Sequence, residues 1–296
     1  MPELPEVEAL ALDLGARLTG RAIHRIDVLE IAALKTVEPP VAALHGKAVL
    51  GVARRGKHLV LSVESGPHLV IHLARSGWIR WREAAPRPTA GRGRGPLAAR
   101  AVLEPTDGDP PGGDGFDVTE QATRKRLAIH VVEHPEQVLS IATLGPEPLA
   151  ADFTEERFAG ILAAAGRAQI KGVLRDQQRI AGIGNAYSDE ILHAAAMSPF
   201  HPASMPADEV HRLYAALRQV LQEAVEHAAG VPASSLKAEK RQRMRVHGRK
   251  GEACPACGDT VRQVIYADST LEYCATCQTG GKPLSDRVLS RLGVRR

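Results

Sequence analysis

Apolar residues at helical spacing begin within the first turns of the chain. The pattern predicts a helix over 5–18, because its apolar positions recur along one helical face. Proline suits the first turn of a helix, where its missing N–H costs nothing, so Pro5 marks the start. The helix dipole favours carboxylates in the same turn, where Glu6 and Glu8 lie. The apolar face consists of Val7, Leu10, Ala11, Leu14 and Leu18.

The pattern then changes to short segments rich in β-branched residues, separated by Gly and Pro turns. This alternation is typical of an all-β sandwich or barrel. Two stretches, EAAPRPTAGRGRGP and PTDGDPPGGDG, are too rich in Gly and Pro to pack, and they are predicted to be mobile loops. The predicted strands lie in AIHRIDVLEI, AVLGVARRG, HLVLSVES, HLVIHLARSG, GWIRW, LAARAVLE and RLAIHVVE.

Helical spacing returns after residue 153 and continues to about residue 229. The helical segments are FTEERFAGILAAA, IKGVLRDQ, SDEILHAAA and ADEVHRLYAALRQVLQEAVEHAA. The sequence therefore predicts an α+β protein, in which a β-rich domain precedes a helical one. The predicted parts are a first domain at 1–135, a linker at 136–152, a helical domain at 153–235, and a basic crossing with every cysteine and the C-terminal tail at 236–296.

Length and composition fit a globular protein. At 296 residues and 31.7 kDa the chain allows one or two domains with buried cores. Hydrophobic residues make up 44% and charged residues 24%. No apolar run reaches the roughly 20 residues of a membrane-spanning helix, and the first residues are acidic where a secretory signal is basic. The sequence predicts a cytoplasmic protein with no membrane partner.

The basic residues are unevenly spread, although the net charge is only +4 and the sequence pI is about 9.0. Between Lys237 and Lys250 there are seven Lys or Arg residues and one acid, Glu239. Such a run is usually a solvated surface, but its position before the cysteines favours phosphate binding. Aromatic residues make up 3% of the chain, which argues against the stacking platforms of single-strand binders.

All four cysteines fall in two C-x2-C pairs with sixteen residues between them. Tetrahedral zinc is held by such pairs, because two intervening residues let one turn present both thiolates. Disulfides are disfavoured in a cytoplasmic chain, and a redox site would require only one C-x2-C pair, or knuckle, instead of two. The segment TVRQVIYADSTLEY between the pairs is predicted to form a hairpin. We therefore expect one structural Zn²⁺ with the ligands Cys254, Cys257, Cys274 and Cys277.

The helical domain contains a glycine turn in IAGIGNAYSDEIL. Gly182 and Gly184 allow a tight turn, after which a helix is expected to open at Ser188, Asp189 and Glu190. The unpaired N–H groups at a helix start suit an anion. Taken alone, such a turn more often marks a simple chain reversal.

Six motifs in a fixed order carry a family resemblance: MPELPEVE, RRGKHLVL, HLARSG, LGPEPL, IAGIGNAYSDEIL and the two cysteine pairs. Together they resemble the formamidopyrimidine-DNA glycosylase and endonuclease VIII family. The resemblance implies an N-terminal helix on a β-sandwich, then a helix-two-turn-helix domain ending in a zinc finger, with DNA between the domains. It also implies a bifunctional DNA glycosylase and abasic-site lyase of base excision repair. Such an enzyme would be a nucleoid-associated monomer whose partner is double-stranded DNA with damaged bases or abasic sites.

The resemblance implies that Met1 is removed and that the secondary amine of Pro2 attacks the sugar carbon bearing the damaged base. The chemistry agrees, because an α-amino group titrates near about pH 8, against about 10.4 for lysine. Glu3 is the implied acid at the sugar ring oxygen, Glu6 supports it, and Lys57 assists strand scission. Elimination at the 3′ and then the 5′ side would leave a one-nucleotide gap. In isolation, these carboxylates and this lysine would indicate only helix capping and surface charge.

The resemblance also implies DNA contacts. Asn185, beside Gly184, matches the family's phosphate-gripping asparagine. Phosphate contacts on both sides of a lesion allow a nucleotide to be rotated out of the duplex. The further predicted contacts with DNA are Lys171, Gly184, Arg245 and Ser269.

Three places depart from the family pattern. Arg75 stands where many relatives have a methionine that fills the gap left by the flipped base, so we expect its guanidinium to enter the duplex or to contact phosphate. Ser269 stands where a finger arginine commonly grips phosphate. The family's usual Arg and Phe wedge motif cannot be identified in this sequence, and the only candidates in its region are Arg124, Lys125 and Arg126.

The segment before the finger is short. Formamidopyrimidine-type relatives carry a longer, glycine-containing loop over an everted 8-oxoguanine, whereas this chain has only RQRMR between SSLKAEK and VHGRKGEAC. We therefore expect weak 8-oxoguanine excision and a preference for abasic sites, oxidised pyrimidines or ring-opened lesions. The alternatives are that the loop around GRGRGP replaces the lid or that the pocket takes a bulky adduct.

Two other functions fit part of the sequence. A non-catalytic paralogue that binds damaged or branched DNA needs the fold but no nucleophile with its acid. A zinc-ribbon adaptor for RNA or protein explains the cysteines but not MPELPEVE. The presence of Pro2, Glu3 and Lys57 favours the enzyme.

Overall fold

The computed structural model describes residues 1–84, 96–105, 113–266 and 269–284. The chain forms two compact units. The first boundary between them falls after residue 143, within the stretch predicted as a linker, and the cysteine-rich part shares a unit with most of the helices. The N-terminal unit comprises Met1–Thr143 and His227–Leu236, and the C-terminal unit comprises Leu144–Glu226 and Lys237–Arg296.

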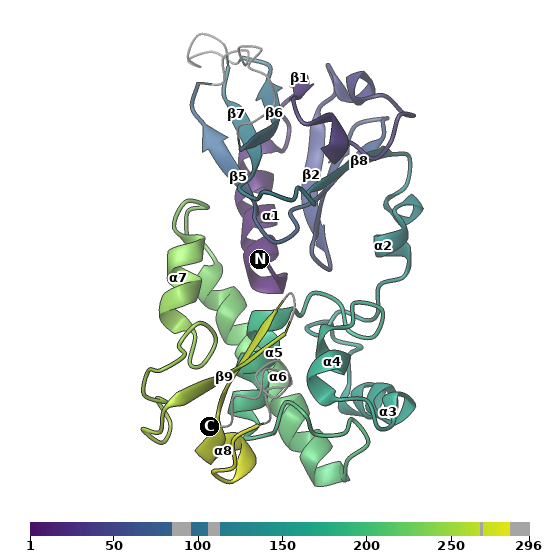
Figure 1. Ribbon diagram of the computed structural model, residues 1–296. Helices are drawn as coiled ribbons and strands as arrows, with labels where there is room; N and C mark the ends of the chain where they lie inside the picture. The colour runs from purple at the N-terminus through teal and green to yellow at the C-terminus, as the bar shows by residue number, and fades with distance from the viewer. Residues whose placement is uncertain (85–95, 106–112, 267–268, 285–296) are drawn as a thin grey trace. The chain divides into compact units, whose positions relative to one another are not determined.

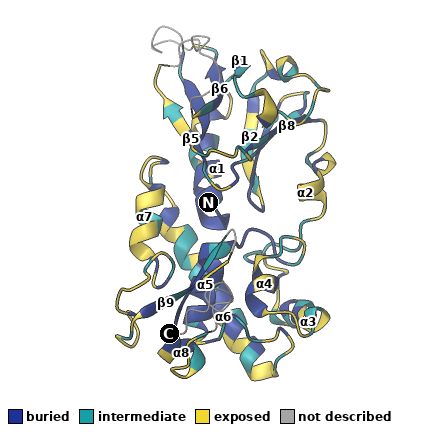
Figure 2. Cartoon of the chain, in the orientation of Figure 1, coloured by how far each residue is buried: buried dark blue, intermediate teal, exposed yellow. Residues whose placement is uncertain are grey.

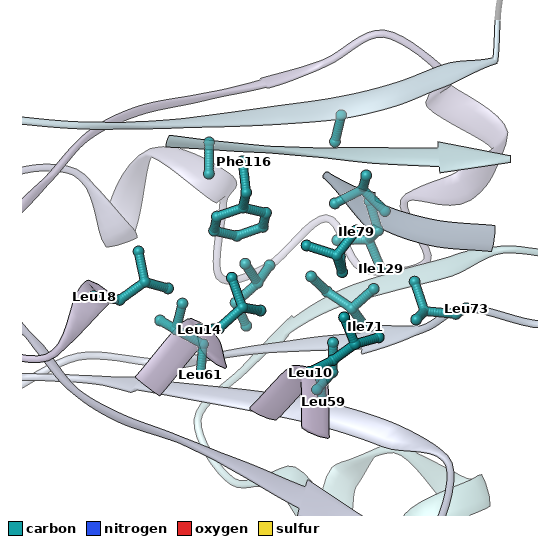
Figure 3. Close-up of a cluster of buried hydrophobic side chains, with 14 of the residues drawn as sticks. Leu10, Leu14, Leu18, Leu59, Leu61, Ile71, Leu73, Ile79, Phe116 and Ile129 are labelled. Atoms are coloured by element: carbon teal, nitrogen blue, oxygen red, sulfur yellow. The ribbon is translucent and has the colours of Figure 1, made fainter. Parts of the chain in front are cut away.

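Helix α1 (Leu4–Leu18) is the predicted N-terminal helix. Its apolar face is fully packed, because Leu10, Leu14 and Leu18 are each at most 2% exposed. Figure 3 shows these side chains among strand residues such as Leu61 and Phe116. Complete burial of a leucine contributes about 1.5–3 kcal/mol. Packing rather than intrinsic propensity therefore fixes the helix that carries the chain's first residues.

The strands of the N-terminal unit form two antiparallel four-stranded sheets (Figure 1). One sheet has the order β1-β6-β7-β5 and the other the order β2-β3-β4-β8. Apolar side chains from both sheets and from α1 share one core. The strands are β1 (Ile23–Val28), β2 (Val49–Arg55), β3 (His58–Val63), β4 (His68–His72), β5 (Gly77–Arg82), β6 (Leu97–Leu103), β7 (Gly115–Glu120) and β8 (Ala128–Val132).

Short helices and a returning segment complete the N-terminal unit. The short helices are η1 (Ile31–Ala33), η2 (Val41–Leu44), η3 (Pro135–Gln137) and α2 (Leu139–Ala142). The returning segment His227–Leu236 contributes Ala228, Ala233 and Leu236 to the core. The indole N–H of Trp78 donates to the carbonyl oxygen of Ala233 at 2.8 Å, which fixes the segment against β5.

The C-terminal unit is built mainly from helices. In helix α5, every residue from Ala186 to His193 is buried (Figure 2). Strands β9 and β10 pair in an antiparallel hairpin, as predicted for the segment between the cysteine pairs. The elements are α3 (Glu155–Ala165), α4 (Ile170–Arg175), α5 (Asn185–Ala194), α6 (Ala207–Ala228), α7 (Leu236–Arg243), β9 (Val261–Ile265), β10 (Thr270–Cys274) and α8 (Ala275–Thr279), with the end of α6 and the start of α7 in the N-terminal unit.

The predicted fold class is confirmed: an N-terminal helix with two sheets, a helical domain and a finger with clustered cysteines. Each predicted strand segment contains an observed strand. The observed elements that were not predicted are strand β7, helices α2, α7 and α8, and the 3-10 helices η1, η2 and η3. The helix expected to open at Ser188 begins at Asn185, so Ser188, Asp189 and Glu190 lie beyond its first residues. Parts of the predicted mobile loops, 85–95 and 106–112, lie outside the described residues.

The helices of the described residues include none that is both long enough and apolar enough to cross a membrane.

Candidate functional site

The predicted nucleophile and its acids lie at the start of α1. Pro2 is buried, and Glu3 is 2% exposed at the residue that precedes the helix. A side-chain oxygen of Glu6 accepts the backbone N–H of Glu3 at 2.9 Å. The helix start is therefore a closed, buried turn in which two carboxylates lie next to Pro2.

Lys57 lies in the two-residue turn between β2 and β3 and is 8% exposed. Arg54 connects this turn to α1. Its Nε lies 2.6 Å from Oε2 of Glu8, and its Nη1 donates to the carbonyl oxygen of Gly56 at 3.1 Å. Charge-assisted bonds of this kind are short and directional. The residue before Lys57 is thus held to the same helix that Glu3 caps.

Two histidines in ring contact adjoin the Lys57 turn, with 4.7 Å between the ring centroids of His58 and His72 and an angle of 35° between the ring planes. Burial and the neighbouring His72 lower the pKa of His58 to about 4. Burial and the charge of Lys57 lower the pKa of His72 to about 4. Nε2 of His58 lies 2.9 Å from Oγ of Ser140 in α2. Both imidazoles are therefore neutral at neutral pH.

Arg75 lies at the exposed tip of the β4–β5 turn. The turn is tight, because the N–H of Gly77 donates to the carbonyl oxygen of Leu73 at 2.8 Å, and Ala74 adopts a φ of 51°. A Cβ at Gly77 would lie 2.1 Å from the same carbonyl oxygen, so only glycine fits. The predicted duplex-entering residue is therefore presented on a rigid turn.

The loop before β8, where the wedge residues were sought, is held by a buried carboxylate. Glu120 is 2% exposed and accepts the backbone N–H groups of Arg126 and Leu127 at 2.9–3.1 Å. Nζ of Lys125 donates to the carbonyl oxygen of Glu120 at 2.6 Å. Arg124 is exposed. Of the three candidates, Lys125 therefore has a clear role within the loop.

Helix α5 begins at Asn185, and Gly184 precedes it as the capping residue. Gly182 has a φ of 83°, which supports the predicted glycine turn. Nδ2 of Asn185 donates to the carbonyl oxygen of Thr270 in β10 at 2.8 Å. The predicted phosphate-binding residue is therefore in contact with the finger hairpin. Ser269, next to Thr270, closes the hairpin by accepting the N–H of Tyr266 at 2.8 Å.

Lys171 lies behind this turn rather than at its surface, since it is 5% exposed. Its Nζ lies 3.2 Å from the carbonyl oxygen of Asn185, 2.9 Å from Oγ of Ser188 and 2.5 Å from Oδ1 of Asp189. This placement favours a role in holding the start of α5, instead of the direct DNA contact that the sequence suggested.

Asp189 also connects α5 to the finger. Nδ1 of His247 lies 2.8 Å from Oδ2 of Asp189 and 2.9 Å from Oε2 of Glu272. Burial alone would lower the pKa of His247, but hydrogen bonds to these carboxylates raise it to about 9. Among the described residues these three also form a group with the spacing of metal ligands. With its pKa raised, His247 is held between the two carboxylates in a buried ion network.

Glu190 fixes the segment that follows α7. It is 4% exposed, and its carboxylate accepts the backbone N–H groups of Arg245, Val246 and His247 at 2.8–3.0 Å. The side chain of Arg245 is exposed, and its Nη2 lies 3.9 Å from Oε2 of Glu223. The basic crossing is thus anchored through its backbone, which leaves the Arg245 guanidinium near the surface.

The four cysteine sulfurs lie within 4.8 Å of one another. Sγ of Cys254 is 3.9 Å from that of Cys277, and Sγ of Cys257 is 3.4 Å from that of Cys274. Sulfurs bound to one tetrahedral zinc at about 2.3 Å lie about 3.8 Å apart, so the donor set fits this ion. All four cysteines are free of disulfides. They would hold the metal at the base of the β9–β10 hairpin.

Comparisons with known protein families agree with the N-terminal and helical domains described above. The model of the formamidopyrimidine-DNA glycosylase N-terminal domain matches residues 1–109, and that of the glycosylase's H2TH domain matches residues 144–235. A formamidopyrimidine-DNA glycosylase of Chloroflexus aurantiacus is 34% identical over 290 residues, 94% of this chain and 98% of the relative. The chain belongs to the formamidopyrimidine-DNA glycosylase family.

Further relatives of this glycosylase family match in sequence and structure. A formamidopyrimidine-DNA glycosylase-like protein of Mycobacterium tuberculosis is 51% identical over 150 residues, 50% of this chain and 93% of that protein. The crystal structure of MutM (Fpg) from Thermus thermophilus has a TM-score of 0.77 at 33% identity, covering 95% of this chain and 100% of the other. Lactococcus lactis Fpg in complex with DNA containing N7-benzyl-Fapy-dG has a TM-score of 0.80 at 25% identity, covering 94% and 100%.

In this member of the glycosylase family, sequence reasoning missed residues that hold the predicted site in place. Glu8 was identified only as a charge in the first helical turn, and Arg54 only as part of a motif; their ion pair joins segments 46 residues apart. His193, which contacts Cys254, lies within the predicted helical segment SDEILHAAA, but nothing in the sequence distinguished it. Each of these contacts depends on the tertiary fold.

Proposed function

We propose that the protein is a bifunctional DNA glycosylase and abasic-site lyase that removes oxidised or ring-opened bases from double-stranded DNA. Membership of a DNA glycosylase family supports the reaction class, and the Lactococcus lactis relative is bound to damaged DNA. The observation that carries the proposal is local. Pro2 and Glu3 lie at the buried start of α1, and Arg54 ties the Lys57 turn to that helix.

The proposed reaction begins after removal of Met1, which frees the secondary amine of Pro2. The Pro2 nitrogen bonds to C1′ of the sugar, the bond from C1′ to the base breaks, and the departing base takes up a proton. Glu3 protonates the ring oxygen, so the ring opens and an iminium forms between C1′ and Pro2. Glu6 holds the Glu3 backbone in place for this step.

Strand scission follows from the iminium. Loss of a proton from C2′ expels the 3′ phosphate oxygen, and loss of a proton from C4′ then expels the 5′ phosphate oxygen. Water hydrolyses the remaining iminium and returns the free amine of Pro2. Lys57 assists these eliminations and contacts a flanking phosphate in the proposal. The neutral state of His58 and His72 means that the adjacent histidine pair adds no further positive charge beside Lys57.

The proposed DNA contacts involve both units. Asn185 stands at the start of α5, where helix N–H groups suit a phosphate, and Lys171 positions it from behind. Arg75 and Arg245 have exposed side chains, and Ser269 lies at the end of the finger hairpin. We assign Arg75 to the gap left by the everted nucleotide, and the other two to the DNA backbone.

We propose one structural Zn²⁺ bound by Cys254, Cys257, Cys274 and Cys277. A four-thiolate site leaves no open coordination position, so the metal would supply folding energy for the finger rather than reaction chemistry. The spacing of the sulfurs supports this assignment.

Imine trapping tests the function. Protein whose terminus has been confirmed as Pro2 is incubated with duplex DNA carrying an abasic site or a single base lesion, with borohydride present. We expect a covalent protein–DNA adduct that maps to Pro2. A Glu3→Gln variant should lose adduct formation on intact lesions, because the acid for ring opening is missing.

The control is Pro2→Gly, which keeps a terminal amine and is expected to give reduced rather than abolished trapping. An undiminished adduct that maps to a lysine would remove the nucleophile assignment. Tight binding of damaged duplexes without any adduct or nicking would instead identify the non-catalytic, DNA-binding paralogue.

A further inference from the structure

A buried histidine from α5 lies against the cysteine cluster. His193 is 6% exposed, and its Nε2 lies 3.2 Å from Sγ of Cys254, which is 2% exposed. The two residues are 61 positions apart in the chain. The surroundings of the cluster therefore include a side chain from the helical domain, outside the finger.

The imidazole is not one of the grouped metal-ligand atoms. Across the described residues, the group whose donor atoms all lie within 4.8 Å of one another contains the four sulfurs and does not include His193. Four thiolates already complete the tetrahedral coordination of zinc. The contact thus runs from His193 to a ligand of the proposed metal, and not to the position of the metal itself.

The chemistry of the contact defines the position of the imidazole proton. A metal-bound thiolate presents lone pairs, so the nitrogen that faces it at 3.2 Å must carry a proton. In a neutral ring this leaves Nδ1 of His193 as an acceptor. Nδ1 is buried and has no hydrogen-bond partner among the described residues. The ring is therefore oriented so that Nε2 contacts the sulfur while Nδ1 has no partner among the described residues.

We propose that His193 is an outer partner of the zinc centre, whose Nε2–H donates to the Cys254 thiolate. The proposal rests on the zinc assignment of the preceding section. A donor at this sulfur holds it in the ligating orientation and withdraws part of its negative charge. Mutation of such outer partners of metal ligands typically lowers metal affinity by about 10- to 100-fold.

Other contacts of α5 agree with a metal site shared between helix and finger. Asn185, at the start of the same helix, donates to Thr270 of the hairpin. Gln278 of α8 donates to the carbonyl oxygen of Met197 at 2.9 Å, shortly after the end of α5. Its Oε1 accepts the N–H of Cys274 at 2.9 Å. The cysteines at both knuckles are thus connected to the helical domain through single side chains.

The experiment compares side chains with and without a donor at position 193, in the full chain. His193→Phe keeps a buried ring but has no N–H, and His193→Leu is a second variant without a donor. His193→Gln is close to leucine in size and retains N–H groups. His211→Phe is the matched control, because His211 is an exposed histidine of the same unit whose Nδ1 lies 2.9 Å from Oε2 of Glu155.

Two measurements read out the contact. Zinc affinity is measured by competition with a chromogenic chelator, and the protein is loaded with Co²⁺ so that sulfur-to-cobalt absorption can be recorded. We expect His193→Phe and His193→Leu to bind zinc about 10- to 100-fold more weakly. Their charge-transfer band should move to lower energy, because the sulfur lone pairs lose a donor. His193→Gln should lie near the wild type, and His211→Phe should match it.

The outcomes are distinct. Wild-type zinc affinity and an unchanged cobalt spectrum in the Phe and Leu variants would overturn the proposal. Equal weakening in the Gln and Leu variants would also overturn it, because ring packing rather than the donor would then matter. If Phe prevents folding, the comparison of Gln with Leu still decides. A wild-type protein without a four-sulfur cobalt spectrum would refute the zinc assignment itself.

Discussion

Buried carboxylates hold the functional segments by accepting backbone N–H groups. Glu6 accepts that of Glu3, Glu120 accepts those of two residues before β8, and Glu190 accepts those of three residues after α7. These segments lack strand or helix partners for those groups, which otherwise would be unsatisfied in the interior. The partners of Glu190 lie 55–57 residues away. No local sequence pattern identifies the role of Glu190, whereas the contact of Glu6 with Glu3 is a local capping box.

The histidine pair predicts how the stability of the N-terminal unit depends on pH. The pKa of His72 is about 4 in the folded protein, against an ordinary value of 6.5. Between these values the unfolded chain binds more protons, so folding stability is full above about pH 6.5 and falls as the pH decreases. Lowering the pH from 7 to 5 should therefore cost about 2 kcal/mol through His72.

The measurement is the free energy of unfolding in urea at the two pH values, followed by tryptophan fluorescence. Both tryptophans of the chain, Trp78 and Trp81, belong to the N-terminal unit. His72→Gln removes the titrating group and should reduce the loss between pH 7 and 5 by about 2 kcal/mol. The same loss in wild type and variant would show that His72 is not buried in its neutral form.

At the scale of elements, β7 shows why one strand was missed. Its sequence GFDVTE contains polar residues at alternate and adjacent positions, yet every residue of the strand is buried. The carboxylate of Asp117 is accommodated because Nε of Arg100, on the neighbouring strand β6, lies 2.6 Å from it. Strands with an apolar pattern were predictable, whereas a strand whose polar side chains are neutralised by a partner was not.

Helix α7 was not predicted because it is too polar to show helical periodicity. Its sequence LKAEKRQR has strong helix formers but no apolar face, and Leu236 is its buried residue. From its charge, the sequence analysis predicted only a basic crossing in this segment. The contact of Nζ of Lys240 with the ring of Tyr187, at 4.5 Å from the centroid, adds a cation–π interaction that no periodicity indicates.

The short connection at α7 predicts substrate preference. The helix ends at Arg243, and Glu190 already binds the backbone N–H groups of Arg245, Val246 and His247. Between the helix and this anchor there is no loop to close over an everted base and read the carbonyl oxygen of 8-oxoguanine. We therefore expect weak 8-oxoguanine excision, with faster removal of oxidised pyrimidines or ring-opened lesions and faster abasic-site cleavage.

Single-turnover rates on matched duplexes test this expectation, with 8-oxoguanine opposite cytosine compared with a dihydropyrimidine lesion. A pre-formed abasic site in the same sequence is the control, since its cleavage needs no base recognition. Equal rates on the two base lesions would refute the argument from the missing loop. In that case another segment would have to supply the contacts to the oxidised purine.

At the scale of the whole molecule, the N-terminal unit is not one continuous stretch of the chain, because the later segment His227–Leu236 belongs to it. The sequence placed residues up to 235 with the helices, and the H2TH family model also ends at residue 235, but in the structure His227–Leu236 packs with the N-terminal unit. Helical spacing shows that a segment is amphipathic but does not show which core it enters. The clustering of the two cysteine pairs, in contrast, could be predicted from the sequence, because the spacing within each pair is set by local geometry.

The proposed zinc predicts that the two units respond differently to loss of one ligand. Cys257→Ser should lose the metal, and the finger should unfold, since structural zinc supplies about 10 kcal/mol or more of folding free energy. Release of the finger frees the contacts of Asn185 with Thr270 and of His193 with Cys254. DNA affinity should therefore fall together with zinc content.

The N-terminal unit should be unaffected, because the described residues of its core include none from the finger. The urea midpoint from tryptophan fluorescence should thus be the same in Cys257→Ser and wild type, while hydrogen exchange in α5 becomes faster. Ala256→Ser, within the same knuckle but not a ligand, is the matched control and should keep zinc and DNA affinity. Freshly purified wild type without zinc would refute the metal assignment. Normal zinc content in Cys257→Ser would show that three thiolates suffice, and an equal shift of both units on zinc loss would mean that they fold as one cooperative body.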